Sequence, residues 1–189
     1  MLVFIFLLLT LHVVSANDIF SAVANDDASE IRKLLAEHPS MLNSKGPGGQ
    51  TPLMNAVLSG KVISVEALLS HKADVTIPEK DGYVPIHGAG FQGRAEIAQL
   101  LIDNGVSVLS PHSDGYLPFH RACWGTEERH TETVRVFLEA GGMDYAHKAS
   151  NGQTCWKMTK NAGTKKLLKE YKEKKNKSSS SSSSSSEEL

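Results

Sequence analysis

Apolar residues recur along the chain in pairs of short blocks, each spaced as on one face of a helix. The first block of each central pair begins at a proline, and Gly-rich or polar segments separate the pairs. The second blocks carry apolar residues at three- and four-residue intervals: Val65, Leu68 and Leu69; Ile97, Leu100 and Leu101; and Val134, Phe137 and Leu138. An upstream pair covers 19–23 and 31–35. This pattern predicts a succession of short amphipathic helices arranged two by two.

The pairs repeat with a period marked by a glycine and, three residues later, a proline. Copies begin at Gly49, Gly82 and Gly115, 33 residues apart, and a fourth begins at Gly152 after 37. Each proline suits the first turn of a helix, where its missing N–H costs nothing, and each glycine suits a tight turn. One helix pair cannot bury its apolar face alone, so the repeats are expected to stack into a solenoid.

The three clear copies read Gly-Gln-Thr-Pro-Leu-Met-Asn-Ala at 49–56, Gly-Tyr-Val-Pro-Ile-His-Gly-Ala at 82–89 and Gly-Tyr-Leu-Pro-Phe-His-Arg-Ala at 115–122. They resemble the ankyrin repeat family, whose motif is Gly-x-Thr-Pro-Leu-His-x-Ala. The resemblance implies an all-α solenoid of about four to five stacked helix pairs joined by β-hairpin-like turns. The expected domain is 17–172, with repeats at about 17–48, 49–81, 82–114, 115–151 and 152–172.

The last repeat departs from the motif. Cys155 replaces the proline, and the second helix is short and rich in lysine. Such decay is typical of a capping repeat, because its outer face meets water. Lys166, Lys169 and Lys172 flank apolar residues at helical spacing, which predicts a capping helix with a basic polar side.

The N-terminus predicts entry into the secretory pathway. The apolar run from Leu2 to Val14 would rise about 20 Å as a helix, too little to cross a bilayer core of about 30 Å. Val14-Ser15-Ala16 suits signal peptidase, so 1–16 is expected to be a signal peptide and the protein to be secreted or retained in the endoplasmic reticulum lumen. No basic residue precedes the run. The alternative is a buried N-terminal helix and a cytoplasmic protein.

The C-terminal segment 173–189 is expected to be a disordered Lys/Ser-rich tail. Its final Ser-Glu-Glu-Leu is similar to the Lys-Asp-Glu-Leu retrieval signal, and an acidic solubilising tail is the alternative. Asn176 begins an Asn-Lys-Ser sequon and is a candidate for glycosylation if the chain enters the endoplasmic reticulum.

The charge balance of the chain bears on the class of protein. Lys and Arg number 20 against 21 Asp and Glu, which argues against a nucleic-acid binder. Residues 17–156 hold 11 basic and 17 acidic residues (net −6), and 157–177 hold nine Lys and two Glu (net +7).

Cys123 and Cys155 are one and a half helical turns out of register in adjacent repeats. About 10 Å of helix spacing and about 7 Å along the axis exceed the reach of a disulfide, so both thiols are expected to be reduced.

No residue pattern indicates catalysis, a metal or a cofactor. The histidines lack metal-ligand spacing, and no nucleophile elbow or phosphate loop is present in the sequence. For His87 and His120, the resemblance implies a ring that hydrogen-bonds across to the turn of a neighbouring repeat. The expected function is therefore a non-enzymatic protein–protein interaction module, monomeric, with another protein as partner.

The resemblance also implies where the partner binds, in the concave groove of hairpin tips and first helices. Aligned with that groove are Tyr83, Phe91, Tyr116 and Trp124 as the contact core and Asp81 and Asp114 as its polar rim. Two alternatives stay open: the Phe and Trp pack between repeats, and the two Asp only shape the turns. The alternative function is a luminal scaffold or regulatory subunit of an enzyme complex that acts through its basic C-terminal helix.

Overall fold

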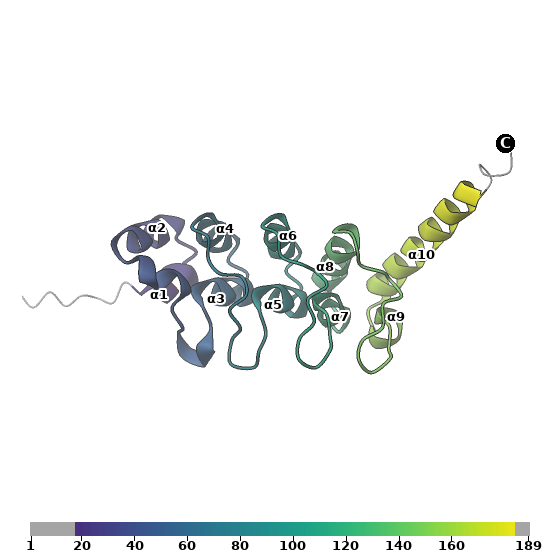
Figure 1. The fold of residues 1–189 in the computed structure, drawn as a ribbon, viewed down its shortest axis with the longest axis horizontal. Helices are drawn as coiled ribbons and strands as arrows, with labels where there is room; N and C mark the ends of the chain where they lie inside the picture. Colours follow the sequence, from purple (N-terminus) through teal and green to yellow (C-terminus); the bar gives the residue numbers. More distant parts are fainter. Residues whose placement is uncertain (1–17, 184–189) are drawn as a thin grey trace, which may run out of the picture.

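The computed structural model describes residues 18–183, and side chains to residue 177. Helices follow one another in pairs that stack in a single row (Figure 1). The first helices of the pairs are α1 (Ile19–Ala24), α3 (Pro52–Ser59), α5 (Pro85–Gln92), α7 (Pro118–Cys123) and α9 (Cys155–Met158). The second helices are α2 (Ala28–Glu37), α4 (Val62–Ser70), α6 (Ala95–Asp103), α8 (Glu128–Glu139) and α10 (Ala162–Ser183).

Strands are absent from the described residues, where pairing of that kind is limited to an isolated antiparallel bridge between Lys148 and Thr154. Two 3₁₀ segments, η1 (Pro39–Asn43) and η2 (Pro47–Gly49), occupy the first long connection. The expected all-α solenoid of stacked helix pairs is confirmed.

Each central first helix begins as the motif predicts, and α3 and α5 also end as it predicts. Pro52, Pro85 and Pro118 are the first helical residues of α3, α5 and α7. Gly60 and Gly93 end α3 and α5 in the left-handed conformation, with φ of 73° and 66°. Because a side chain is strained there, glycine fixes where these helices stop.

The hairpin-like turns project from one side of the row, below the first helices in Figure 1. The same backbone hydrogen bond closes each of them. The donor and acceptor residues are Gly46 and Gln50, Glu79 and Tyr83, His112 and Tyr116, and Ala149 and Gln153, at 2.9–3.0 Å. The residue after each turn therefore occupies the same place in every repeat.

The core lies between the two layers of helices and is continuous through the stack. The residue after each proline, Leu53, Ile86 or Phe119, is fully buried, and so are the motif alanines Ala56, Ala89 and Ala122. Small alanines let successive first helices approach closely, and the larger side chains then fill the space between repeats.

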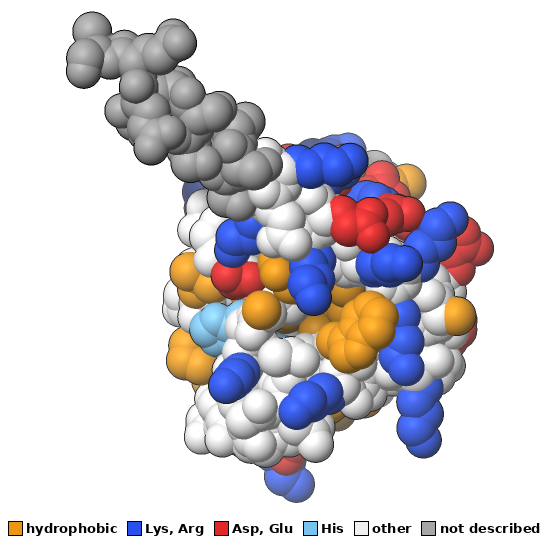
Figure 2. Space-filling model, turned by 90° about the vertical axis from the view of Figure 1, so that its right-hand side faces the viewer, with side chains coloured by type: hydrophobic (Ala, Val, Ile, Leu, Met, Phe, Trp, Pro, Cys, Tyr) orange, Lys and Arg blue, Asp and Glu red, His pale blue; other side chains and the backbone are white. Residues whose placement is uncertain are grey.

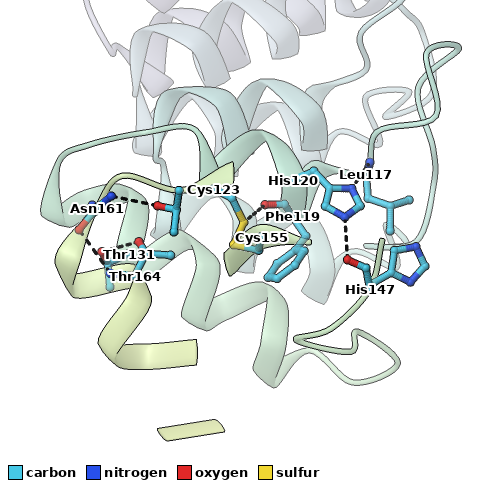
Figure 3. The surroundings of a disulfide bond; sticks show 10 residues. Leu117, Phe119, His120, Cys123, Thr131, His147, Cys155, Asn161 and Thr164 are labelled. Carbon is cyan, nitrogen blue, oxygen red and sulfur yellow. Dashed lines mark hydrogen bonds between the residues drawn. A yellow bond between two sulfur atoms is a disulfide. The ribbon is translucent and has the colours of Figure 1, made fainter. Parts of the chain in front are cut away.

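Cys123 and Cys155 form a disulfide with a Cα–Cα distance of 5.5 Å (Figure 3), so the expectation of two reduced thiols is wrong. The preceding repeat shows why. Gly90 occupies the position of Cys123, and a Cβ on Gly90 would overlap the carbonyl oxygen of Pro118, which occupies the position of Cys155. The end of one first helix thus meets the start of the next. The expected separation of Cys123 and Cys155 was too large, because it assumed that the two helices keep a fixed spacing along their whole length.

Hydrogen bonds also hold the last pair to the stack (Figure 3). The Asn161 side-chain amide donates to the Glu127 carbonyl at 2.9 Å, and the hydroxyls of Thr131 and Thr164 lie 2.9 Å apart. Together with the disulfide, these contacts fix α9 and the start of α10 against α7 and α8.

The C-terminal helix is longer than the sequence predicts. α10 continues to Ser183, so the structure differs from the expected disordered tail over 173–183. Lys and Glu are strong helix formers, and Lys175 pairs with Asp144 at 2.7 Å. The expected signal peptide and the Glu-Glu-Leu end lie outside the described residues. None of the described helices has the length and apolarity needed to cross a membrane.

Candidate protein-binding groove

Arg121 of α7 is the centre of an aromatic cluster on the first-helix side of the stack. Its guanidinium carbon lies 4.9 Å from the ring centre of Tyr83, 5.0 Å from that of Tyr116 and 4.6 Å from that of Trp124. The Arg121 residue is only 4% exposed. A guanidinium over aromatic faces is attracted by their negative π-surface, and more strongly when it is shielded from water.

Asp114 supplies the counter-charge to Arg121, through an ion pair between its Oδ2 and Nη2 of Arg121. Partial desolvation raises the pKa of Asp114, but hydrogen bonds from the Arg121 side chain, the Tyr116 backbone N–H and the His112 ring outweigh it and lower this pKa to about 2. Asp114 is therefore ionised at neutral pH, and its charge is already matched within the protein.

His112 extends the cluster toward the preceding turn. Its ring stacks on Tyr83 with the ring centres 4.0 Å apart and the planes 8° from parallel. Its Nε2 lies 3.0 Å from the Asp81 carbonyl oxygen. The Tyr83 ring thus contacts His112 of the next turn and Arg121 of the next first helix, and these two side chains also lie 3.4 Å from each other.

A cavity of about 280 Å³ opens beside this cluster, between α3, α5 and the end of α7. Met54, Leu58, Phe91 and Trp124 give it apolar walls, and Gly88 of α5 lies at its base. A Cβ on Gly88 would approach Leu58 Cδ2 to 3.2 Å and Met54 Cε to 3.3 Å. The absence of a side chain at Gly88 therefore contributes to the open space.

Two aromatic side chains at the cavity remain accessible to solvent. Phe91 is 56% exposed and Trp124 is 40% exposed. The alternative in which both pack between repeats is wrong, because burial of that kind would remove them from water. Glu79 and Asp81 lie at the same cavity and give it an acidic edge.

His87 lines the cavity, and its ring approaches the next turn less closely than the expected role requires. Neither ring nitrogen forms a hydrogen bond of normal geometry within the described residues. Burial and, next, the charge interaction with His112 lower the pKa of His87 to about 4, although a weaker interaction with the Ser110 backbone in the next turn raises it. His120 does behave as expected: its Nε2 lies 3.4 Å from the His147 carbonyl of the next turn, and its Nδ1 accepts the Leu117 N–H at 3.1 Å.

The structure brings together the residues that the sequence analysis aligned with the groove. Tyr83, Tyr116 and Trp124 surround one guanidinium, and Phe91 faces the same cavity as Trp124. Asp81 is exposed at the edge, whereas Asp114 is engaged with Arg121. Asp114 is also exposed, and the Tyr116 N–H donates to its Oδ1, as the alternative of a turn-shaping role expects.

Sequence reasoning missed Arg121 and His112. Arg121 occupies a motif position that holds Asn55 and Gly88 in the preceding copies, so a long cation stands there only beside the Tyr- and Trp-containing repeats. This unusual arginine was the feature of the sequence that could have pointed to the cluster. No such feature marked His112, because its stacking on Tyr83 depends on how two turns lie in space.

The geometry of the groove suits the binding of another molecule. No group of three or more His, Cys, Asp or Glu side chains in that part of the chain could hold a metal ion. The features that remain are a shaped apolar cavity, a rigid aromatic wall and an acidic edge, which suit recognition of another molecule's surface.

The fold defines this chain as a helical repeat solenoid. Residues 19–112 match the family model of ankyrin repeats in three copies. The chain belongs to the ankyrin repeat family, and ankyrin repeats indicate a protein–protein interaction module. The family is typically non-enzymatic.

Curated relatives share only part of their length with the chain. It is 38% identical over 60 residues to inversin of Gallus gallus, which corresponds to 32% of this chain and 5% of that protein. It is 33% identical over 66 residues to a protein of Rickettsia felis named for its ankyrin repeats, which corresponds to 35% of this chain and 22% of that protein. The chain thus spans less than a quarter of the length of either relative.

Proposed function

We propose that this protein binds a partner protein in the groove between α3, α5 and α7, with Phe91 and Trp124 as its principal contacts. The supporting observation is their exposure at the mouth of an apolar cavity, beside the rigid Arg121 cluster. Exposed aromatic side chains that line a preformed pocket are the type of residue that carries most binding energy at interfaces.

The role of each residue follows from its surroundings. Tyr83 and Tyr116 hold Arg121 between them, and Trp124 covers it from the end of α7. Since these rings are ordered before binding, the partner loses less of its affinity to the ordering of side chains. The cavity volume suits one large apolar side chain of the partner, and Asp81 at the edge suits a basic residue next to it.

Affinity capture with matched variants tests the proposal. The full chain with Phe91→Ala and Trp124→Ala is compared with a chain carrying Ile63→Ala and Leu109→Ala, two large apolar residues that are similarly exposed elsewhere. We expect a partner captured by the wild type to be retained by the control pair and lost by the groove pair. Retention by both pairs would place the binding surface outside the groove.

We also propose that the protein acts in the secretory pathway, either secreted or in the endoplasmic reticulum lumen, with residues 1–16 as a cleaved leader. The buried Cys123–Cys155 disulfide supports this location, because disulfides persist in oxidising compartments and are rare in the cytosol. Asn176 is exposed on α10 and is the proposed glycosylation site.

Expression in a eukaryotic cell tests this location. A mature N-terminus at Asn17, and a mass shift on endoglycosidase treatment that Asn176→Gln abolishes, are expected. An intact Met1 with alkylatable Cys123 and Cys155 would instead support a cytoplasmic protein.

A further inference from the structure

The outer surface of the last helix pair breaks the pattern of a capping repeat. Trp156 is one residue after the start of α9, in the place that Leu53, Ile86 and Phe119 occupy in α3, α5 and α7. Those three side chains are fully buried, whereas Trp156 is 48% exposed. A capping repeat is expected to be polar on its outer face, because no further repeat covers it. An exposed tryptophan there points to a surface that another molecule covers.

A cavity lies next to Trp156 on this surface, with a volume of about 490 Å³. Tyr145, Trp156 and the buried Leu168 give it an apolar base, and α9 and α10 form its sides. Figure 2 shows the corresponding face of the molecule, with an apolar area that Lys and Arg side chains surround.

The rim of this cavity is uniformly basic. Lys157, Lys169 and Lys172 line it, and Nζ of Lys165 lies 6.0 Å from the centre of the Trp156 ring. No acidic side chain lines the cavity. Among residues 18–177, whose side chains the structure describes, none of these four lysines forms a salt bridge to a carboxylate. The positive charge is therefore available to a ligand.

We propose that this C-terminal face is a second binding site, which takes an acidic segment of a partner protein with an apolar side chain inserted beside Trp156. Charge complementarity selects the acidic residues, and the concave apolar base selects the inserted side chain. A concave pocket suits a projecting side chain better than the smooth surface of a bilayer. The site is separate from the groove, because it lies on α9 and α10 and shares no lining residue with the groove cavity.

The probe for this site is a short fluorescein-labelled peptide of Glu, Asp and Ser with two central Leu residues. It is titrated into the full chain carrying Trp124→Phe, which leaves Trp156 as the only tryptophan. We expect bound peptide to protect Trp156 from quenching by acrylamide. Two control peptides carry Gln in place of the acidic residues, or Ser in place of Leu, and are expected to bind weakly.

Variants of the rim and base locate the contact. Trp156→Ala should weaken peptide binding about thirtyfold, as for a central interface residue. Lys169→Gln with Lys172→Gln should weaken it about fivefold, since each exposed ion pair contributes modestly. Lys160→Gln with Lys166→Gln is the matched control, because both lysines lie at the same end of the molecule but outside the cavity. The control pair should change affinity less than about twofold, and Phe91→Ala in the groove should leave it unchanged.

Four results would overturn the proposal. Equal weakening by the two lysine pairs would indicate nonspecific attraction to the basic end. Equal binding of the Gln peptide would remove the acidic requirement. Binding of phosphatidylserine vesicles but not of the peptide would assign the face to a membrane. Trp156-dependent self-association in sedimentation, without peptide binding, would assign it to a second copy of the chain.

Discussion

The guanidinium of Arg121 lies over the ring of Tyr83, although the arginine belongs to α7 and the tyrosine to the turn before α5. This contact joins two successive repeats on the same side as the cavity. It links a buried charge, which the stack must stabilise, to the aromatic wall that a partner would meet. If the proposed function holds, stability and recognition depend on the same cluster.

Replacement of Arg121 by Ala should destabilise the fold by about 2–4 kcal/mol, because three cation–π contacts and a partly buried ion pair are lost together. Arg121→Lys should cost less but still weaken the fold, since an ammonium cannot stack as a planar group does. Urea unfolding followed by circular dichroism measures both. Wild-type stability in Arg121→Ala would show that the cluster contributes nothing to the fold.

Gly88→Ala should separate stability from binding. The new methyl group enters the groove cavity, so capture of the partner should fall. Alanine has a higher helix propensity than glycine by about 1 kcal/mol, which offsets the displacement of the Leu58 and Met54 side-chain ends. The melting temperature should therefore stay within a few degrees of wild type. Full capture by this variant would argue that the partner does not enter the cavity.

Loss of the Cys123–Cys155 disulfide should lower stability by about 3–4 kcal/mol, because the bond closes a loop with a sequence separation of 32 residues. Thermal unfolding with and without dithiothreitol measures the effect on wild type. The Cys123→Ala, Cys155→Ala variant is the control and should melt at one temperature in both buffers. A wild type that is fully alkylated without reductant would contradict the bond.

His87 should make stability fall as the solution becomes mildly acidic. Its pKa is about 4 in the folded protein, below the 6.5 of an ordinary histidine, so the unfolded chain binds more protons between these values. The neutral ring's contribution is complete above pH 6.5 and is lost as pH falls toward 4. About 2 kcal/mol should disappear between about pH 7 and pH 5. His87→Met should flatten this dependence, leaving the part due to His120, whose pKa burial also lowers. An unchanged pH profile in His87→Met would assign the loss to other groups.

Leu101 and Leu168 should differ in how far their loss spreads. Both are buried, but Leu101 lies in the middle of the stack and Leu168 in its last pair. Leu101→Ala should cost about 2–5 kcal/mol and raise amide exchange in the repeats on both sides. Leu168→Ala should raise exchange mainly in α9 and α10 and cost less. Leu100 is only partly buried, so Leu100→Ala should cost less than Leu101→Ala. Equal global destabilisation by Leu101→Ala and Leu168→Ala would contradict nearest-neighbour stacking.

The sequence by itself determined the repeat and its local conformations. Pro52, Pro85 and Pro118 start helices because the missing N–H has no partner to lose, and Gly60 and Gly93 end them because they accept a positive φ. Such constraints act within a few residues, so the period and the helix pairs could be read from composition and spacing. The residues expected to face the groove came from the resemblance to the ankyrin repeat family, which the period carries onto each copy.

Only the tertiary structure decided which residues meet between repeats. The Cys123–Cys155 bond depends on how the end of α7 approaches the start of α9, and the aromatic cluster depends on Arg121 reaching back to Tyr83. His87 and His120 occupy the same motif position, yet among the described residues a hydrogen bond of normal geometry to the next turn is found only for His120. These outcomes rest on angles and close approaches between helices far apart along the chain, which local sequence patterns do not encode.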